Sequence, residues 1–341
     1  MTRNEISAAP EGFAAASRNR CYNHVMTPPP IVRYPDGIIA IDCEMAGHHG
    51  LIAAFVIEGP NPVVIETGPA TVMPDLTAGL DSLGIGRTDV ATFVGTHIHL
   101  DHAGAGGDVA DAYPSATVAV HEWGVKHMAD PSKLMASAYR VFGDRLDTLF
   151  GPLKPVPQDR LRALDEGDVI DAGGGRQIRV LYTPGHARHH ITLHDTQTDA
   201  IFVGDSMGVY LPEAGILRPA TPPPDFDFHL ALSALERYRE LDPATIYFSH
   251  FGPAPAGRDM ITEARRKLIE YARIVREAMR QSEDLDHVSE KLVEATASEY
   301  AEVYADPELS ARFDALNAFR SSAAGYLRYF QQNPQAEIPG V

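Results

Sequence analysis

The stretch "THIHLDHAG" at residues 96–104 places three histidines and one aspartate within six consecutive positions. Histidine supplies a neutral nitrogen ligand to metal ions, and aspartate adds an oxygen ligand with a negative charge. The apolar run "ATFVG" precedes this stretch and is typical of a short buried strand. The sequence therefore predicts a metal site on a loop at the end of a strand, rather than a histidine-rich polar loop.

The spacing inside this stretch indicates more than one metal ion. His97 and His99 are two residues apart, so their side chains point to the same side of an extended segment. Asp101 and His102 follow directly and are expected to face the other way. A catalytic metal uses about three protein ligands and a water, so each of two neighbouring ions needs further ligands from elsewhere.

Three later segments offer such ligands, and each comes directly after a predicted strand. They are "YTPGHARHH" with His186, "IFVGDS" with Asp205, and "IYFSHFG" with His250. Strand ends that meet at one sheet edge bring distant residues together. The prediction is then one ion on His97, His99 and His186, another on Asp101, His102 and His250, and Asp205 bridging the two. Such paired ions lie ~3.5–4 Å apart.

The amino-acid composition indicates which classes of substrate and binding partner the protein can have. The chain has 341 residues and 44% hydrophobic content, enough for one large domain with an appendage. Its formal net charge of −17 disfavours nucleic acid. The apolar runs are too short to cross a bilayer, and the N-terminus lacks the apolar core of a signal peptide. With only Cys21 and Cys43 as cysteines, we expect a cytoplasmic protein that acts on a small-molecule substrate and binds neither nucleic acid nor a membrane.

The pattern along the chain predicts an α+β protein in three parts. Residues 1–30 are expected to be a mobile N-terminal arm, 31–256 a catalytic domain with a helical insert at 122–150, and 257–341 a helical C-terminal appendage. Two strand-rich stretches, each closed by a helix, indicate two sheets face to face with helices outside. In the appendage a helix with an apolar stripe from 261 to 279 precedes two or three further helices. The appendage is expected to cap the site, pack on the core or form a homodimer interface.

The ligand series as a whole resembles a known family. The pattern H-x-H-x-D-H, a histidine after "TPG", an aspartate in "VGDS" and a histidine in "SHFG" is similar to the metallo-β-lactamase superfamily, in particular its glyoxalase II-like and lactonase-like hydrolases. The resemblance covers roughly residues 36–255. It implies an αββα four-layer sandwich with two divalent metal ions at one edge, zinc in first place and iron or manganese as alternatives.

Several positions depart from the family pattern. Glu66 in "VVIETG" stands where the superfamily often has an aspartate, and together with His189 and His190 it is expected to orient ligands without binding metal. Quorum-quenching lactonases place a tyrosine three residues after the bridging aspartate, where this chain has Gly208, with Tyr210 two residues further on. Tyr210 either packs in the core or contacts the substrate. Neither cysteine lies near the motifs, so β-lactam hydrolysis is not expected.

The ligand set predicts a metal-dependent hydrolase. A hydroxide bridging the two ions would attack an ester, lactone, thioester or amide of a small organic substrate. The expected catalytic residues are Asp101, Asp205 and Tyr210, with Asp101 or Tyr210 protonating the leaving group. Two alternatives remain open: a phosphodiesterase using the same site, and a mononuclear iron sulfur dioxygenase using His97 and His99 with Asp205 or His186.

Overall fold

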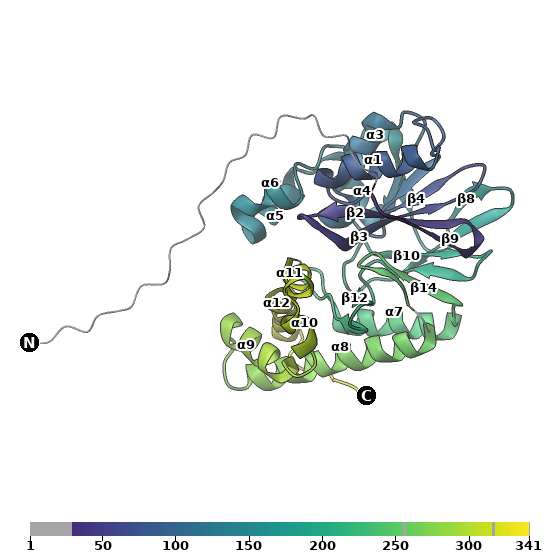
Figure 1. The fold of residues 1–341 in the computed structure, drawn as a ribbon. Helices are drawn as coiled ribbons and strands as arrows, with labels where there is room; N and C mark the ends of the chain where they lie inside the picture. The colour runs from purple at the N-terminus through teal and green to yellow at the C-terminus, as the bar shows by residue number, and fades with distance from the viewer. Residues whose placement is uncertain (1–28, 255–256, 316–317, 341) are drawn as a thin grey trace, which may run out of the picture.

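The computed structural model describes residues 29–254, 257–315 and 318–340. Two β-sheets pack face to face, and helices cover the outer face of each (Figure 1). This confirms the predicted αββα sandwich. The expected arm over residues 1–30 lies almost wholly outside the described residues; at its end, the Pro30 carbonyl accepts a hydrogen bond from the Asp42 amide at 2.9 Å.

The first sheet has seven strands in chain order: β1 (Ile31–Tyr34), β2 (Ile38–Met45), β3 (His48–Ile57), β4 (Val63–Ile65), β5 (Thr92–Val94), β6 (Thr117–His121) and β7 (Leu161–Leu164). The pairs from β1 to β4 are antiparallel, and those from β4 to β7 are parallel. Most of β2 and β3 is buried on both faces, between helices and the second sheet. This is why they read as continuous apolar runs rather than alternating ones.

The second sheet has six strands in the order β15-β14-β11-β10-β9-β8. Their bounds are β8 (Val169–Gly173), β9 (Arg176–Tyr182), β10 (Ile191–Asp195), β11 (Ala200–Phe202), β14 (Thr245–Phe248) and β15 (Gly252–Ala254). Between the sheets, the ring of Phe55 lies 5.2 Å from that of Phe202 and 5.4 Å from that of Tyr247. A separate hairpin of β12 (Val209–Leu211) and β13 (Ile216–Arg218), not predicted from the sequence, follows Asp205 closely.

Helices cover both outer faces of the sandwich. On the first sheet lie α1 (Met73–Ser82) and α3 (Gly106–Ala112), and on the second lie α7 (Phe228–Leu241) and α8 (Gly257–Met279) (Figure 1). The segment 122–150 is helical, as predicted, with α4 (Glu122–Ala129), α5 (Ser132–Phe142) and α6 (Leu146–Leu149). Short 3₁₀ turns occupy Pro35–Gly37, Ala70–Val72, Gly143–Arg145 and Gln158–Arg160.

The C-terminal appendage holds more helices than predicted. In the part of the chain that the structure describes, four helices follow α8 rather than two or three: α9 (Leu285–Thr296), α10 (Ala301–Ala305), α11 (Pro307–Ala315) and α12 (Ala318–Gln332). The difference arises at Asp306–Pro307. The Asp306 carboxylate accepts from the amides of Glu308 and Leu309 at 2.9 and 3.1 Å, and Pro307 cannot continue the preceding helix. No helix in the described part of the chain is long and apolar enough to cross a membrane.

Candidate metal centre

The first ligands lie on a tight connection after β5. His97 and His99 occupy the loop, and Asp101 and His102 lie in the short helix α2 (Leu100–Ala103) that begins directly after His99. The change from extended to helical backbone at His99 turns the later pair away from the earlier one. The amides of residues 67 and 68 donate to the His102 carbonyl at 2.8 and 3.1 Å, which fixes the end of this helix against β4.

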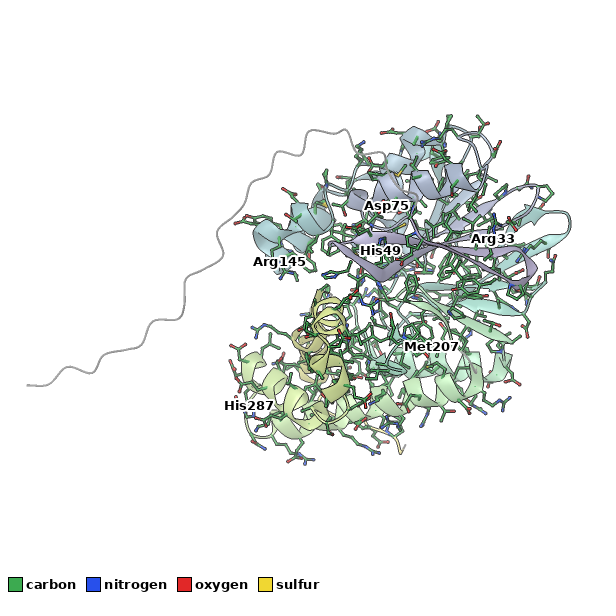
Figure 2. All side chains as sticks on the ribbon, in the orientation of Figure 1. Arg33, His49, Asp75, Arg145, Met207 and His287 are labelled. Carbon is green, nitrogen blue, oxygen red and sulfur yellow. The ribbon has the colours of Figure 1, made fainter. Side chains whose placement is uncertain are left out.

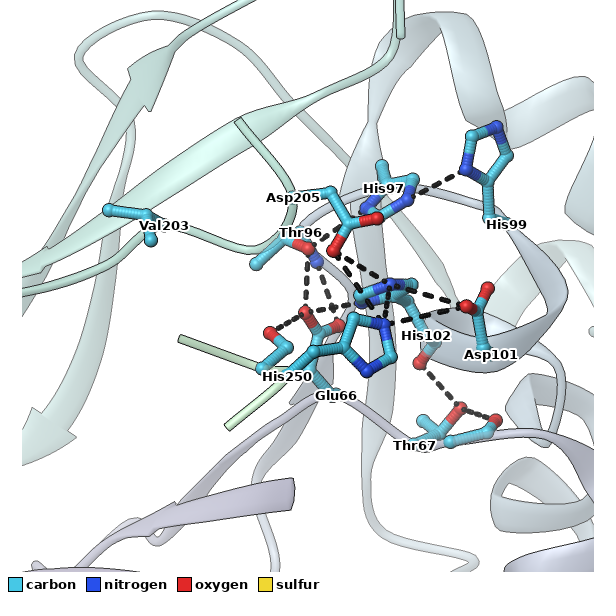
Figure 3. A network of polar contacts seen from close by, with 12 residues as sticks. Glu66, Thr67, Thr96, His97, His99, Asp101, His102, Val203, Asp205 and His250 are labelled. Atoms are coloured by element: carbon cyan, nitrogen blue, oxygen red, sulfur yellow. Dashed lines mark hydrogen bonds and ion pairs between the residues drawn. The ribbon is translucent and has the colours of Figure 1, made fainter. Parts of the chain in front are cut away.

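All seven predicted metal ligands come together in the structure. Ligand atoms lie within 4.8 Å of one another in each of three groups: His97, His99 and His186; His97, His102 and Asp205; and Asp101, His102 and His250. Asp205 lies beside His97 and faces His102 and His250 (Figure 3). Its Oδ1 is 3.4 Å from Nε2 of His102 and 3.6 Å from Nε2 of His250, and its Oδ2 is 3.6 Å from Nε2 of His186. These clusters are consistent with a dinuclear metal site.

Backbone carbonyls orient two of the ligand histidines. Nδ1 of His186 donates to the Ala220 carbonyl at 2.8 Å, and Nδ1 of His250 donates to the Leu51 carbonyl. A carbonyl can only accept, so the proton of each ring lies on Nδ1. The lone pair on Nε2 is therefore free and points into the cluster, as a metal ligand requires.

Glu66 orients the other two Nε2 ligands. Its Oε1 accepts from Nδ1 of His102 at 3.0 Å, from the Thr96 hydroxyl at 2.6 Å and from the Ser249 hydroxyl at 2.8 Å (Figure 3). Since the Thr96 hydroxyl donates to the carboxylate, its oxygen accepts from Nδ1 of His97 at 3.1 Å. Glu66 is fully buried and contacts the ligand histidines through these hydrogen bonds, and its assignment as a residue that orients ligands without binding metal stays a prediction.

His189 and His190 lie next to the ligands but belong to none of the three groups. The amide of Asp205 donates to Nε2 of His190 at 3.3 Å, and Nδ1 of His190 faces the Thr183 hydroxyl at 3.0 Å. The amide of Ile98 donates to Nδ1 of His189 at 3.3 Å. Both rings thus hold the backbone beside a ligand, and their assignment as orienting residues stays a prediction.

The donor atoms fit bound cations. Nε2 of His97 and Nε2 of His186 approach Nδ1 of His99 to 2.9 and 3.0 Å, and Nε2 of His102 lies 3.2 Å from Nε2 of His250. These imidazole nitrogens face one another in a buried region, and a cation between them stabilises such an arrangement of ligand atoms. Within the described residues, Oδ1 of Asp205 is also buried without a hydrogen-bond partner.

The three-histidine group is held in the neutral form. Burial and the charge of neighbouring histidines put the pKa of His97 well below its ordinary value. The same causes lower the pKa of His99 to about 3, and burial lowers the pKa of His186. Neutral imidazole is the form that binds a metal, so this group does not need to lose protons at neutral pH.

The group of Asp101, His102 and His250, called the second group from here on, lies among carboxylates, because Glu66 and Asp205 also face His102. Burial alone would lower the pKa of His102, but the charges of Glu66 and Asp205 hold it well above its ordinary value. Burial would raise the pKa of Asp101, yet His102 and His250 lower it, and the pKa of Asp205 is held well below its ordinary value mainly by the same two histidines. The carboxylates of this group are therefore ionised.

Tyr210 packs beside the second group. Its amide donates to the His250 carbonyl at 2.5 Å, and its ring centroid lies 5.5 Å from that of Phe248. Burial and the charge of Glu213 raise the pKa of its hydroxyl, which stays protonated at neutral pH. Among the described residues no hydrogen bond joins this hydroxyl to a predicted ligand, so its role as a proton donor stays a prediction.

The side chains and backbone carbonyls that orient the ligands through hydrogen bonds were not predicted from the sequence. Thr96 and Ser249 each directly precede a ligand histidine, and this adjacency is a usable signal. The carbonyls of Leu51 and Ala220 carry no such signal, because every residue has one.

Similar proteins place the chain in a family. Residues 50–250 match the family described as "Metallo-beta-lactamase superfamily". The metallo-beta-lactamase fold-containing protein ST1585 of Sulfurisphaera tokodaii is 34% identical over 193 residues, which are 56% of this chain and 68% of that protein. A crystal structure of ST1585 from Sulfolobus tokodaii matches with a TM-score of 0.58 and 29% identity, over 67% of this chain and 84% of that one.

Two further relatives match over shorter stretches. The hydroxyacylglutathione hydrolase of Synechococcus sp. (strain JA-3-3Ab) is 26% identical over 53% of this chain and 57% of its own length. The human acyl-coenzyme A thioesterase MBLAC2 is 32% identical over 33% of this chain and 39% of its own length. This chain thus spans little more than half of one and less than half of the other. With its fold, its clustered histidines and aspartates and the family match over residues 50–250, the chain belongs to the metallo-β-lactamase superfamily.

Proposed function

We propose that this protein is a metal-dependent hydrolase that uses two divalent cations to cleave an ester, lactone, thioester or amide bond of a small organic substrate. The observation that supports this most directly is the convergence of two ligand groups on either side of Asp205. A structural zinc site uses four protein ligands and leaves no open position, whereas a catalytic one uses three. Two groups of three ligands therefore favour a catalytic centre.

The chemistry depends on the ions and on the side chains that hold them. Two divalent cations at these positions would lower the pKa of a shared water toward neutrality and polarise the carbonyl under attack. Asp205, with one oxygen toward each group, would keep the two sites at a fixed separation. Glu66 and the Leu51 and Ala220 carbonyls hold the ligand rings in one orientation, so little reorganisation is needed during reaction.

Asp101 is suited to carry the proton between the attacking water and the leaving group. It is only half-buried, and its Oδ2 lies 3.5 Å from Nε2 of His250 and 3.8 Å from Nε2 of His102. Burial would raise the pKa of Asp101, but the charges of these two histidines lower it, so the carboxylate is ionised and free of a proton at neutral pH. The protonated hydroxyl of Tyr210 is the alternative donor.

We propose acyl thioesters as the first substrate class and zinc as the native metal. Two relatives are named as a hydroxyacylglutathione hydrolase and an acyl-coenzyme A thioesterase. Histidine nitrogens combined with carboxylate oxygens suit Zn²⁺. The net charge of −17 favours a small organic substrate over a nucleic acid.

The test combines metal analysis with a substrate panel. The purified protein is expected to hold about two zinc ions per chain and to hydrolyse at least one member of a panel of acyl thioesters, lactones and esters. Asp205→Asn is expected to be inactive, whereas His287→Ala, a change on α9 of the appendage, is expected to leave the activity unchanged. About one iron per chain without hydrolysis of any panel member would contradict the proposal and point to oxygen chemistry on a sulfur substrate.

A further inference from the structure

One arginine of the C-terminal appendage reaches two segments next to the metal centre. Arg312 lies on α11 and is 7% exposed. Its Nη2 donates to Oε1 of Glu213 at 2.7 Å, in the turn between β12 and β13. Its Nη1 donates to the carbonyl of His49, near the start of β3, at 3.4 Å. One guanidinium therefore ties the appendage to the hairpin and to the β2–β3 turn.

The fit at the β2–β3 turn is close. Gly50 has a φ of +73°, and a Cβ at this position would collide with Nη1 of Arg312. On the other side of the turn, the Gly50 amide donates to both carboxylate oxygens of Asp42, at 2.8 and 3.1 Å. Figure 2 shows His49 at the edge of the sandwich near the C-terminal helices. The backbone of residues 49–50 is thus held from the sheet and from the appendage at once.

Both of these segments position His250. The Leu51 carbonyl, two residues after His49, accepts from Nδ1 of His250 and so sets the rotation of its ring. Tyr210, three residues before Glu213, donates its amide to the His250 carbonyl at 2.5 Å and accepts at its own carbonyl from the Phe251 amide at 3.0 Å. The side chain and the backbone of His250 therefore depend on the two segments that the arginine joins.

We propose that Arg312 is a positioning residue for the second metal site, and that the C-terminal helices act through it to set the affinity of the Asp101, His102 and His250 group for its ion. This inference rests on the proposed two-metal function. It assigns the appendage a role in completing the site. Among the described residues, other groups orient two ligands of the three-histidine group: the Ala220 carbonyl faces Nδ1 of His186, and the Thr96 hydroxyl faces Nδ1 of His97.

The test is stepwise metal binding to Arg312→Met. Methionine fills a similar volume without hydrogen-bonding nitrogens, and Glu213, whose side chain is 48% exposed, is solvated when its partner is lost. Titration of the metal-free protein with Zn²⁺ against a chromophoric chelator, and with Co²⁺ followed by its absorption spectrum, reports each site separately. We expect the second ion to bind about tenfold more weakly and the first ion to bind as in the unchanged protein.

The matched control is Arg320→Met, which removes an exposed ion pair between Arg320 on α12 and Asp286 on α9. It is expected to change neither affinity. Two other variants keep the test independent of folding defects in Arg312→Met. Glu213→Gln weakens one of the two contacts of Arg312, at an exposed carboxylate, and is expected to lower the affinity for the second ion slightly. Arg312→Lys, which can reach one partner but not both, is expected to fall between the arginine and methionine proteins.

The outcomes separate this inference from the proposed function. If Arg312→Met bound each ion with the same affinity as the unchanged protein, Arg312 would be a structural contact only, whether or not the melting temperature fell. The proposed two-metal hydrolase would not be affected by that result. An equal loss at both sites would also overturn the inference, because the predicted effect is confined to the second site. If the unchanged protein itself binds only one ion, the proposed function fails first.

Discussion

Replacing Glu66 with glutamine tests how the ligand histidines are held. In the structure, Oε1 of Glu66 accepts three hydrogen bonds, from Thr96 Oγ1, His102 Nδ1 and Ser249 Oγ, and Oε2 accepts one, from the Thr96 amide. A glutamine with its oxygen in the Oε1 position keeps the first three. Its NH₂ group then faces the Thr96 amide, donor against donor. The opposite orientation of the amide would sacrifice three bonds and is disfavoured.

The size of the effect follows from this count. One buried donor left without a partner costs about 1–3 kcal/mol, so the metal-free protein should be destabilised by that amount. Loss of the negative charge behind a ligand histidine lowers the affinity for its metal by about 10–100-fold, which is about 1.4–2.7 kcal/mol. The loss should fall mainly on the ion held by His102. The ion held by His97 should lose less, because the Thr96 hydroxyl stands between His97 and Glu66.

Stepwise Zn²⁺ binding against a chelator and denaturant unfolding of the metal-free protein measure the two quantities. The control is Glu58→Gln, which changes an exposed carboxylate paired with Arg33 at 3.2 Å and is expected to alter stability by less than about 1 kcal/mol. If Glu66→Gln bound both ions with affinities within about twofold of the unchanged protein, the account of Glu66 as the group that holds the ligand rings would be refuted.

Three further predictions concern the ligands themselves. His186→Ala should remove one ion and abolish hydrolysis, whereas His189→Ala should lower kcat/KM by about tenfold. Metal analysis and kinetics measure both effects. A larger loss of metal and activity in His189→Ala than in His186→Ala would show that His189 is the ligand. Asp205→Asn loses one of the two carboxylate oxygens that face the groups, so its metal content should fall to about one ion per chain; two ions by elemental analysis would exclude bridging. Acidification should release the second ion first, because the raised pKa of His102 makes protons compete there, while the pKa of about 3 at His99 keeps its ring neutral well below pH 6. Chelator-monitored zinc release against pH checks the order, and simultaneous release would contradict it.

The predicted ligands were accessible to sequence reasoning because each lies directly after a buried strand or in the loop that follows one. His97 comes after β5, Asp205 after β11 and His250 after β14, and these strand ends meet at one edge of the sandwich. An apolar run followed at once by a histidine or aspartate is visible in a single sequence. This one pattern, an apolar run that ends at a histidine or aspartate, therefore predicted both the strand and the ligand that follows it.

The hydrogen-bond partners of the ligands depend on how neighbouring strands are aligned, and this register cannot be read directly from a single sequence. The Leu51 carbonyl reaches His250 because β3 runs beside residues 249–250, as the hydrogen bond from the Ala53 amide to the Ser249 carbonyl at 3.0 Å shows. The β12–β13 hairpin could not be predicted from the sequence for another reason. Its strands have three residues each, too few to display a periodicity, and its turn is marked by Pro212 and by Gly215 with φ +64°.

Glu66 shows how a departure from the family pattern is accommodated. A glutamate is one methylene longer than the aspartate often found there, and its backbone lies in the left-handed region with a φ of +67°. A non-glycine residue in this region carries strain, which persists only when surrounding contacts favour it. Here the amide of Glu66 donates to the Val94 carbonyl at 2.9 Å, and four donors hold the carboxylate. The longer side chain thus keeps the contact with His102.

The two ligand groups are held in different ways, and this asymmetry connects the predictions. The three-histidine group is neutral in the metal-free protein, and the Ala220 carbonyl orients the ring of its His186. The second group carries ionised carboxylates, with Glu66 behind His102 and the segments joined by Arg312 around His250. Acid, Glu66→Gln and Arg312→Met should therefore all weaken the second ion more than the first. If all three changes weakened binding of the second ion more than that of the first, this would show that the surrounding fold influences catalysis through the occupancy of the second metal site.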